Sequence, residues 1–208
     1  QEDVLAGLIC GPRHPESWHG KNDSVDFFDM KGDLESLVAL TGNAAAFSFT
    51  SAQHIALHPG QCAAIYKQDT LIGYAGALHP GLQKELDLQG PVYLFELNLA
   101  ALTEGVVPAF TALSKHPEVR RDMALLVAES LPVSQMQGVI AEHAGAYLQQ
   151  VGLFDVYAGQ GIAVGKKSLA LSLTWQHPER TLNDDEVNQW FDQVVDAMQT
   201  QCSATLRS

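Results

Sequence analysis

The chain has 208 residues, of which 46% are apolar and 17% charged, so it can bury a substantial core in one large domain or two ordinary ones. Its 12 Lys and Arg residues against 24 Asp and Glu give a formal net charge of −12, which excludes a uniformly basic nucleic-acid-binding surface. No apolar run approaches the roughly 20 residues of a membrane helix, so we expect no membrane partner.

Strand and helix periodicities alternate along the first half of the chain. The apolar run Val4–Cys10, ended by Gly11 and Pro12, predicts a strand. Apolar residues then recur every three or four positions from Phe27 to Leu40, with Gly42 just beyond, which predicts an amphipathic helix with a glycine C-cap.

The rest of the first half predicts an antiparallel sheet with helices on one face. A short helical turn begins at Pro80 and runs through Leu86. The residues after 106 are less patterned, and we place a domain boundary there, giving domains of residues 1–112 and 113–208. The expected strands are Ala46–Thr50, Gln61–Lys67, Leu71–Leu78 and Val92–Leu97.

The second half predicts the order β-α-β-β-α-β, which is the ferredoxin-like plan. Its long helix is capped by Asn183 with Glu186 as the capping-box partner, and its first helix has Ser130 or Leu131 near its cap. The expected fold class is therefore α+β. The predicted elements are strand Asp122–Ala128, helix Pro132–Gly145, strands Tyr147–Tyr157 and Lys167–Trp175, the long helix to about Thr200, and strand Ala204–Arg207.

Three cysteines, Cys10, Cys62 and Cys202, are an odd number without a CxxC pair, which argues against a disulfide framework and favours the reducing cytoplasm. We expect these thiols to be buried and inert. The chain begins QEDV, without an initiator Met or a signal segment, and we interpret it as a piece of a longer protein.

The glycines at 159, 161 and 165 do not form a phosphate-binding loop. A Walker motif needs a glycine where Gln160 stands, and a GxGxxG motif needs one where Val164 stands. We expect a flexible hairpin loop instead.

The eight histidines include His54 and His58, four residues apart, but no Glu or Cys completes a ligand set, so we expect no metal. His58 and His79 precede prolines and are expected to shape turns. One hypothesis remains open, a small independent hydrolase or adenylating enzyme that uses His58, His79 or Cys62. Glu96, in an apolar strand, is expected to be exposed at an edge or paired rather than catalytic.

The second half contains a pattern suited to single-stranded RNA. Asp155 and Tyr157 are two residues apart and leave the same face of a strand, where a carboxylate can accept from a base and an aromatic ring can stack on one. An Asp-x-Tyr pattern also occurs in sheets simply as a cross-strand pair. The candidate RNA-binding residues are Asp155, Tyr157, Ser168, Lys166, Lys167, Arg120 and Arg121.

Several segments of the chain resemble bacterial phenylalanyl-tRNA synthetase β subunits, and the matching segments follow in the same order over nearly the whole length of the chain. In the first half these are Val25–Glu35, Leu57–Ala63, Gly76–Pro80 and Phe95–Leu97. In the second half they are Arg120–Ala124, Leu153–Tyr157, Lys167–Ala170 and Arg180–Leu182.

The resemblance implies a role for each half. The first half is similar to the C-terminal part of the family's catalytic-like module, a class II synthetase-type antiparallel fold without an active site that packs against the catalytic α subunit. The second half is similar to the family's ferredoxin-fold anticodon-binding domain. On the matching motifs, Tyr157 would stack on an anticodon base while Asp155 and Ser168 hydrogen-bond to it.

The same resemblance implies the partners and cofactors. The partners would be the α subunit, in an α2β2 ligase, and phenylalanine tRNA. ATP and magnesium would be used by the whole ligase, and this chain would hold no cofactor and no catalytic residue.

Three positions depart from the family's pattern and weaken the expected phosphate contacts: His116, where an aromatic is usual, and Ala158 and Gln160, in a loop that usually carries a basic residue.

Overall fold

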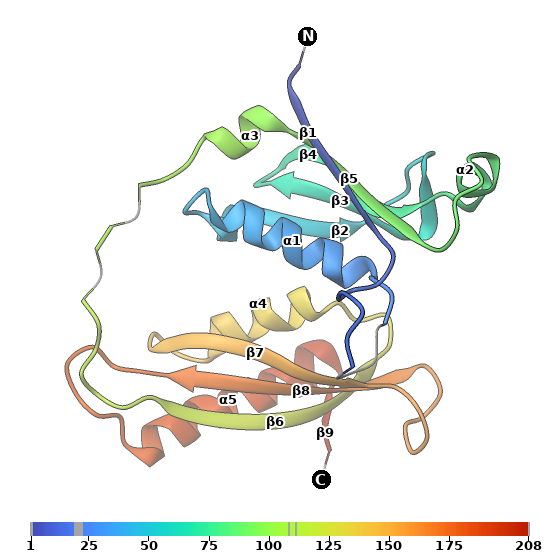
Figure 1. Cartoon of the computed structure of the whole chain (residues 1–208). Helices are drawn as coiled ribbons and strands as arrows, with labels where there is room; N and C mark the ends of the chain where they lie inside the picture. Colours follow the sequence, from blue (N-terminus) through green and yellow to red (C-terminus); the bar gives the residue numbers. More distant parts are fainter. Residues whose placement is uncertain (1, 19–22, 108, 111, 208) are drawn as a thin grey trace. The chain divides into compact units, whose positions relative to one another are not determined.

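The computed structural model describes residues 2–18, 23–107, 109–110 and 112–207 (Figure 1). The chain divides into two compact units, residues 1–110 and 111–208. The boundary predicted from the sequence, between residues 112 and 113, differs from this division by two residues. Each unit has its own sheet and its own buried core, so each is described separately.

The first unit contains a five-stranded antiparallel sheet in the order β1-β5-β4-β3-β2. All five predicted strands are present. The strand β3 starts four residues before its predicted beginning, because a bulge between Leu57 and Cys62 carries the chain past Pro59 and Gly60 without ending the strand. The strands are β1 (Val4–Cys10), β2 (Phe47–Ser51), β3 (Leu57–Lys67), β4 (Thr70–Leu78) and β5 (Val92–Asn98).

Helix α1 (Phe27–Ala39) packs on one face of this sheet through Met30, Leu34 and Val38. Two short helices, α2 (Pro80–Glu85) and α3 (Leu99–Thr103), and a 3-10 turn at Ala44–Ala46 complete the unit. The sequence interpretation missed α3, which has only five residues and follows β5 directly.

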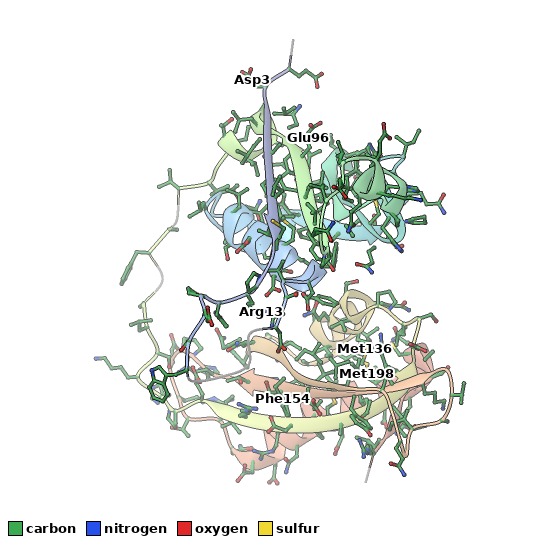
Figure 2. All side chains as sticks on the ribbon, turned by 45° about the vertical axis from the view of Figure 1, so that its right-hand side comes forward. Asp3, Arg13, Glu96, Met136, Phe154 and Met198 are labelled. Atoms are coloured by element: carbon green, nitrogen blue, oxygen red, sulfur yellow. The ribbon has the colours of Figure 1, made fainter. Side chains whose placement is uncertain are left out.

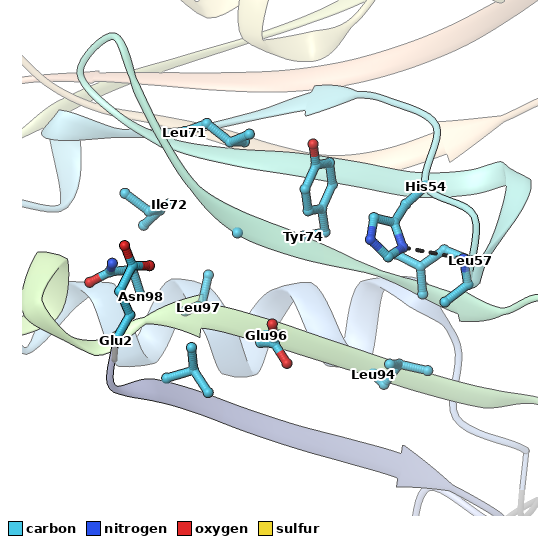
Figure 3. A pocket seen from close by; sticks show the side chains of 13 residues that line it. Glu2, His54, Leu57, Leu71, Ile72, Tyr74, Leu94, Glu96, Leu97 and Asn98 are labelled. Carbon is cyan, nitrogen blue, oxygen red and sulfur yellow. Dashed lines mark hydrogen bonds between the residues drawn. The ribbon is translucent and has the colours of Figure 1, made fainter.

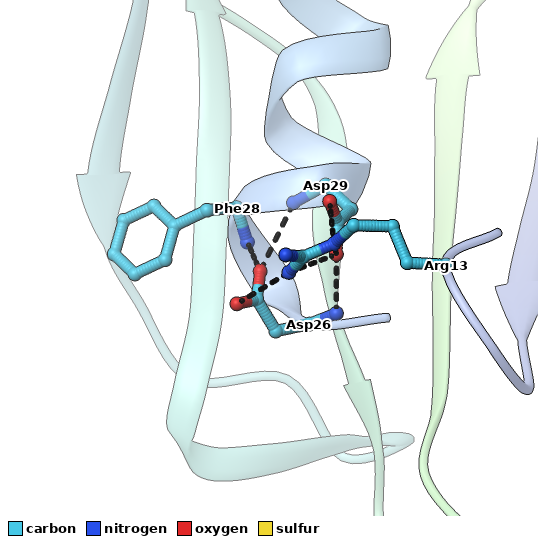
Figure 4. Close-up of polar contacts among 4 residues, drawn as sticks. All are labelled: Arg13, Asp26, Phe28 and Asp29. Atoms are coloured by element: carbon cyan, nitrogen blue, oxygen red, sulfur yellow. Dashed lines mark hydrogen bonds and ion pairs between the residues drawn. The ribbon is translucent and has the colours of Figure 1, made fainter. Parts of the chain in front are cut away.

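The start of α1 is held by a capping box in which the Asp26 side chain accepts from the helix backbone and the Asp29 side chain accepts from the Asp26 N–H (Figure 4). Arg13 joins this cap, with its Nη2 atom 2.9 Å from Asp29 Oδ2. The hydrogen bond from the Asp26 backbone and the Arg13 guanidinium together lower the pKa of Asp29. The cluster thereby ties the segment after β1 to the helix.

The second unit has the predicted β-α-β-β-α-β order and a four-stranded antiparallel sheet in the order β7-β8-β6-β9. This is the ferredoxin-like arrangement. The N-cap of the first helix is Pro132, one or two residues after the expected Leu131 or Ser130, and no side chain caps this helix by a hydrogen bond. The elements are β6 (Val119–Ala128), α4 (Val133–His143), β7 (Leu148–Tyr157), β8 (Lys166–Trp175), α5 (Asp184–Cys202) and β9 (Thr205–Leu206).

Both helices of the second unit cover the same face of the sheet. Met136 of α4 and Met198 of α5 are fully buried against the sheet (Figure 2), and the Trp175 indole N–H donates to the Ala144 carbonyl at 2.7 Å. Because side chains alternate along a strand, the strand residues that reach this core fix which residues face the other way. The strand residues in the core are Met123, Leu125, Val127, Leu169, Leu171, Leu173 and Trp175.

Two further expectations concern the thiols and membrane segments. Cys62 and Cys202 are buried and no cysteine is in a disulfide, but Cys10 is exposed because β1 turns alternate residues outward, which corrects the expectation for that thiol. Within the described ranges, no helix combines the length and apolar character needed to cross a membrane.

Candidate nucleic-acid interface

One face of the second unit's sheet is not covered by α4 or α5, and we call it the open face. Side chains reach it from the strands at every second residue, a pattern that two register shifts in β7 interrupt. The sheet is antiparallel, so residues opposite each other on neighbouring strands bring their side chains together on this face. Its polar, charged and aromatic residues include Arg120, Asp122, Phe154, Asp155, Tyr157, Ser168 and Arg207.

A β-bulge in β7 decides which residues reach the open face. Leu153 lies opposite Leu171, yet Asp155 lies opposite Ala170, so Phe154 is the extra residue. Without the extra residue, strict alternation would turn Asp155 and Tyr157 toward the helices. The bulge therefore delivers Phe154, Asp155 and Tyr157 to the same face.

Tyr157 and Ser168 lie directly opposite each other across β7 and β8. The Tyr157 ring is 39% exposed, and its hydroxyl donates to the Gln160 carbonyl at 3.0 Å, which fixes the ring under the following loop. Ser168 is only 5% exposed, and its hydroxyl oxygen accepts from Arg207 Nη1 at 3.4 Å. An exposed ring, a hydroxyl and a guanidinium thus meet at one point of the open face.

Asp155 is exposed on this face, two residues before Tyr157 on β7. Among the described residues, its carboxylate has no hydrogen-bond or ion-pair partner, so the cross-strand pairing that is common for an Asp-x-Tyr pattern does not occur here. A carboxylate in this state can accept hydrogen bonds from the N–H groups of a base.

Near the start of β6, the Arg120 side chain reaches the bulge residue Phe154. Its Nε atom donates to Asp122 Oδ1 at 2.7 Å, and its guanidinium carbon is 5.6 Å from the centre of the Phe154 ring. Both contacts orient the guanidinium. Its two terminal nitrogens have no partner in the part of the chain that the structure describes, so they are available to donate to a ligand.

The structure does not bring all seven candidate residues together. Lys167 and Arg121 fall on the helix side of the sheet, because they alternate with the open-face residues Ser168 and Arg120. Lys167 Nζ donates to the Leu131 carbonyl at 2.8 Å, and Arg121 Nη2 lies 2.6 Å from Asp184.

These two cations support the junctions between the sheet and the helices, on the opposite side of the sheet from the open-face candidates. Lys166 alternates with Lys167 and is exposed at the end of β8.

Sequence reasoning missed two residues of the open face, Arg207 and Phe154. Arg207 follows β9, where its N–H donates to the Ala124 carbonyl and its side chain reaches across the sheet to Ser168. The alternation of the predicted last strand was the available signal for Arg207. The face of Phe154 depends on the bulge, for which the sequence gives no signal.

The hypothesis of an independent enzyme depends on groups in the first unit. His58 Nδ1 accepts from the Gly60 N–H at 3.0 Å and His79 Nδ1 accepts from the Gly81 N–H at 3.1 Å, so both imidazoles stabilise turns, as expected. Burial raises the pKa of the Cys62 thiol, which is the opposite of what an activated nucleophile needs. Neither the structure nor the comparisons below support this hypothesis.

A pocket of about 440 Å³ lies on the first unit's sheet, on the face away from α1 (Figure 3). Glu96 is exposed there opposite Tyr74, in β5, which is the second strand of the sheet and not an edge strand, and the His54 ring lies 4.9 Å from that of Tyr74. The pocket brings together no nucleophile with an adjacent base. Across the described ranges, no three His, Cys, Asp or Glu side chains are grouped to hold a metal ion.

Comparisons with known proteins agree with this two-unit organisation. Residues 1–99 match the family model described as "Phenylalanyl tRNA synthetase beta chain CLM domain", and residues 114–207 match "Ferredoxin-fold anticodon binding domain". The two matches thus define a synthetase-type module followed by an anticodon-binding domain.

Curated relatives extend the match across the domain boundary. The chain is 49% identical over 207 residues to the phenylalanine–tRNA ligase β subunit of Pseudomonas syringae pv. tomato, 49% over 208 residues to that of Hahella chejuensis and 44% over 207 residues to that of Shewanella oneidensis. In each case the match includes the whole chain, which spans about a quarter, 26%, of the relative's length. The chain belongs to the family of phenylalanine–tRNA ligase β subunits.

Proposed function

We propose that the chain has two non-catalytic functions in phenylalanine–tRNA ligation. Its second unit binds the anticodon of phenylalanine tRNA, and its first unit packs against the catalytic α subunit of a cytoplasmic α2β2 ligase. We attach no cofactor to the chain and assign the ATP and magnesium used by the whole ligase to other parts of the enzyme.

The observation that carries the RNA-binding function is the meeting of Tyr157, Ser168 and Arg207 on the open face of an anticodon-binding domain. A base that stacks on the Tyr157 ring comes within reach of Asp155 on the same strand and of the Ser168 hydroxyl. Arg207 has no carboxylate partner among the described residues, in a chain of net charge −12, so it is free to donate to a phosphate or a base.

Binding by the isolated chain is expected to be weak. Stacking of one base on one aromatic side chain contributes roughly 1 to 3 kcal/mol. The second unit has 7 Lys and Arg against 11 Asp and Glu from residue 114 onward, so the average field repels phosphate. In a ligase that also holds the tRNA elsewhere, the high effective concentration makes a weak anticodon contact sufficient.

The direct test is binding of the anticodon stem-loop of phenylalanine tRNA to the chain at low salt, beside a stem-loop of scrambled loop sequence. Tyr157→Leu is expected to weaken binding by about five- to 150-fold, which corresponds to roughly 1 to 3 kcal/mol. Val156→Ala is the matched control, because Val156 is 56% exposed on the same strand but alternates to the other face. Equal binding of both stem-loops, or no effect of Tyr157→Leu, would contradict the proposal.

The partner of the first unit is tested separately. The sheet face away from α1 carries the partly exposed apolar residues Val4, Leu8 and Leu71, which suits it to protein contact. Leu8→Glu is expected to abolish co-elution of the chain with the α subunit in size-exclusion chromatography. Leu40→Glu, at a position 84% exposed at the end of α1, is the control and should leave co-elution unchanged. Equal behaviour of the two variants would refute the assignment of this face.

A further inference from the structure

We propose that the open face holds a second nucleotide-binding subsite, formed by the Phe154 ring and the Arg120 guanidinium, for the nucleotide next to the one on Tyr157. This inference rests on the proposed RNA binding and extends it from one base to two. The ligand class is a pair of adjacent, unstacked nucleotides of a single-stranded RNA loop.

Phe154 lies at an irregular point of the sheet. It is the extra residue of the β7 bulge, and the contact of its ring with Arg120 places it on the open face together with Asp155 and Tyr157. The ring is 56% exposed, although a ring on a sheet with a large buried core would ordinarily be covered. A bulge that places two aromatic rings on one face resembles the stacking platforms by which four-stranded sheets bind RNA.

The spacing of the two rings along β7 restricts the RNA that can reach both. Phe154 and Tyr157 are three residues apart on one strand, which is about 10 Å of extended chain. This exceeds the 3.4 Å rise between stacked bases, so two neighbouring bases reach both rings only when they are splayed apart. Splayed bases are typical of protein-bound RNA loops, and a duplex cannot present them.

Arg120 is held beside the Phe154 ring by contacts within the protein. Asp122 accepts from its Nε atom, and the Phe154 ring lies under its guanidinium, so the side chain is held in place before any ligand arrives. Its two terminal nitrogens remain unpaired within the described residues. They are suited to a phosphate oxygen or the edge of the base that stacks on Phe154.

The test uses stem-loops that carry 2-aminopurine at one loop position at a time, because its fluorescence falls when the base stacks on an aromatic ring. Binding to the unaltered chain is expected to quench two neighbouring positions. Phe154→Leu should restore fluorescence at one of them and weaken binding about tenfold, while Tyr157→Leu should restore it at the other. Phe154→Tyr keeps a ring and should keep the quenching, and Val156→Ala should change neither property.

The outcomes separate this inference from the proposed function. If Tyr157→Leu weakens binding but Phe154→Leu leaves affinity and quenching unchanged at every position, the second subsite does not exist and the first one stands. If the unaltered chain binds no stem-loop, both are overturned. Loss of affinity in Phe154→Leu without restored fluorescence at a single position would also overturn the subsite, because it would show an effect on the sheet rather than on one base.

Discussion

Replacing Tyr157 by Phe removes only the hydroxyl and separates two functions of this residue. The hydroxyl donates to the Gln160 carbonyl at 3.0 Å and is therefore used within the protein, whereas the ring, 39% exposed, is left for the RNA. An exposed hydrogen bond of this kind contributes about 0.5 to 1.5 kcal/mol, and it acts on the loop and the ring position rather than on a base. We expect Tyr157→Phe to reduce affinity for the stem-loop by less than about fivefold, roughly 1 kcal/mol.

The assay is a titration of labelled stem-loop with Tyr157→Phe and Tyr157→Leu chains side by side. Stacking contributes about 1 to 3 kcal/mol per base, so the Leu variant should lose about five- to 150-fold. A Phe variant as weak as the Leu variant would refute the reasoning, because the hydroxyl would then contact the RNA directly.

Three further outcomes are expected. His79→Ala should lower the free energy of unfolding by about 0.5–1.5 kcal/mol in urea denaturation, and His79→Asn should restore it, because either side chain can accept at the start of α2. Trp175→Phe should cost about 2–4 kcal/mol by the same measurement, because the buried Ala144 carbonyl loses its donor and the core loses volume. The Arg180 guanidinium lowers the pKa of Glu186 to about 2, so the ion pair stabilises the fold above pH 4.5 and this stabilisation is lost as the pH falls toward 2. An acid titration of the free energy of unfolding should show this loss in the unaltered chain, and Glu186→Gln should lack it.

Much of the fold was predictable because its signals are local. The capping box at Asn183 and Glu186 predicted the start of the long helix correctly, and strict alternation in Lys167–Trp175 predicted an inner strand of the second sheet. The order of elements then led to the ferredoxin-like plan. The short helix α3 was missed because five residues are too few for a helical period to appear.

The candidate site was only partly predictable, because the face of a strand residue depends on register. Alternation alone separates Ser168 from Lys167 and Arg120 from Arg121, but only the packing of α4 and α5 showed which member of each pair faces the helices.

The sequence by itself determined most of the elements, their order and the residue types available for RNA. The tertiary structure alone decided the bulge at Phe154 and the meeting of Ser168 with Arg207, 39 residues apart. The physical reason is that register and bulges are set by how strands pair and by what the helices cover, which are properties of contacts between segments distant in sequence.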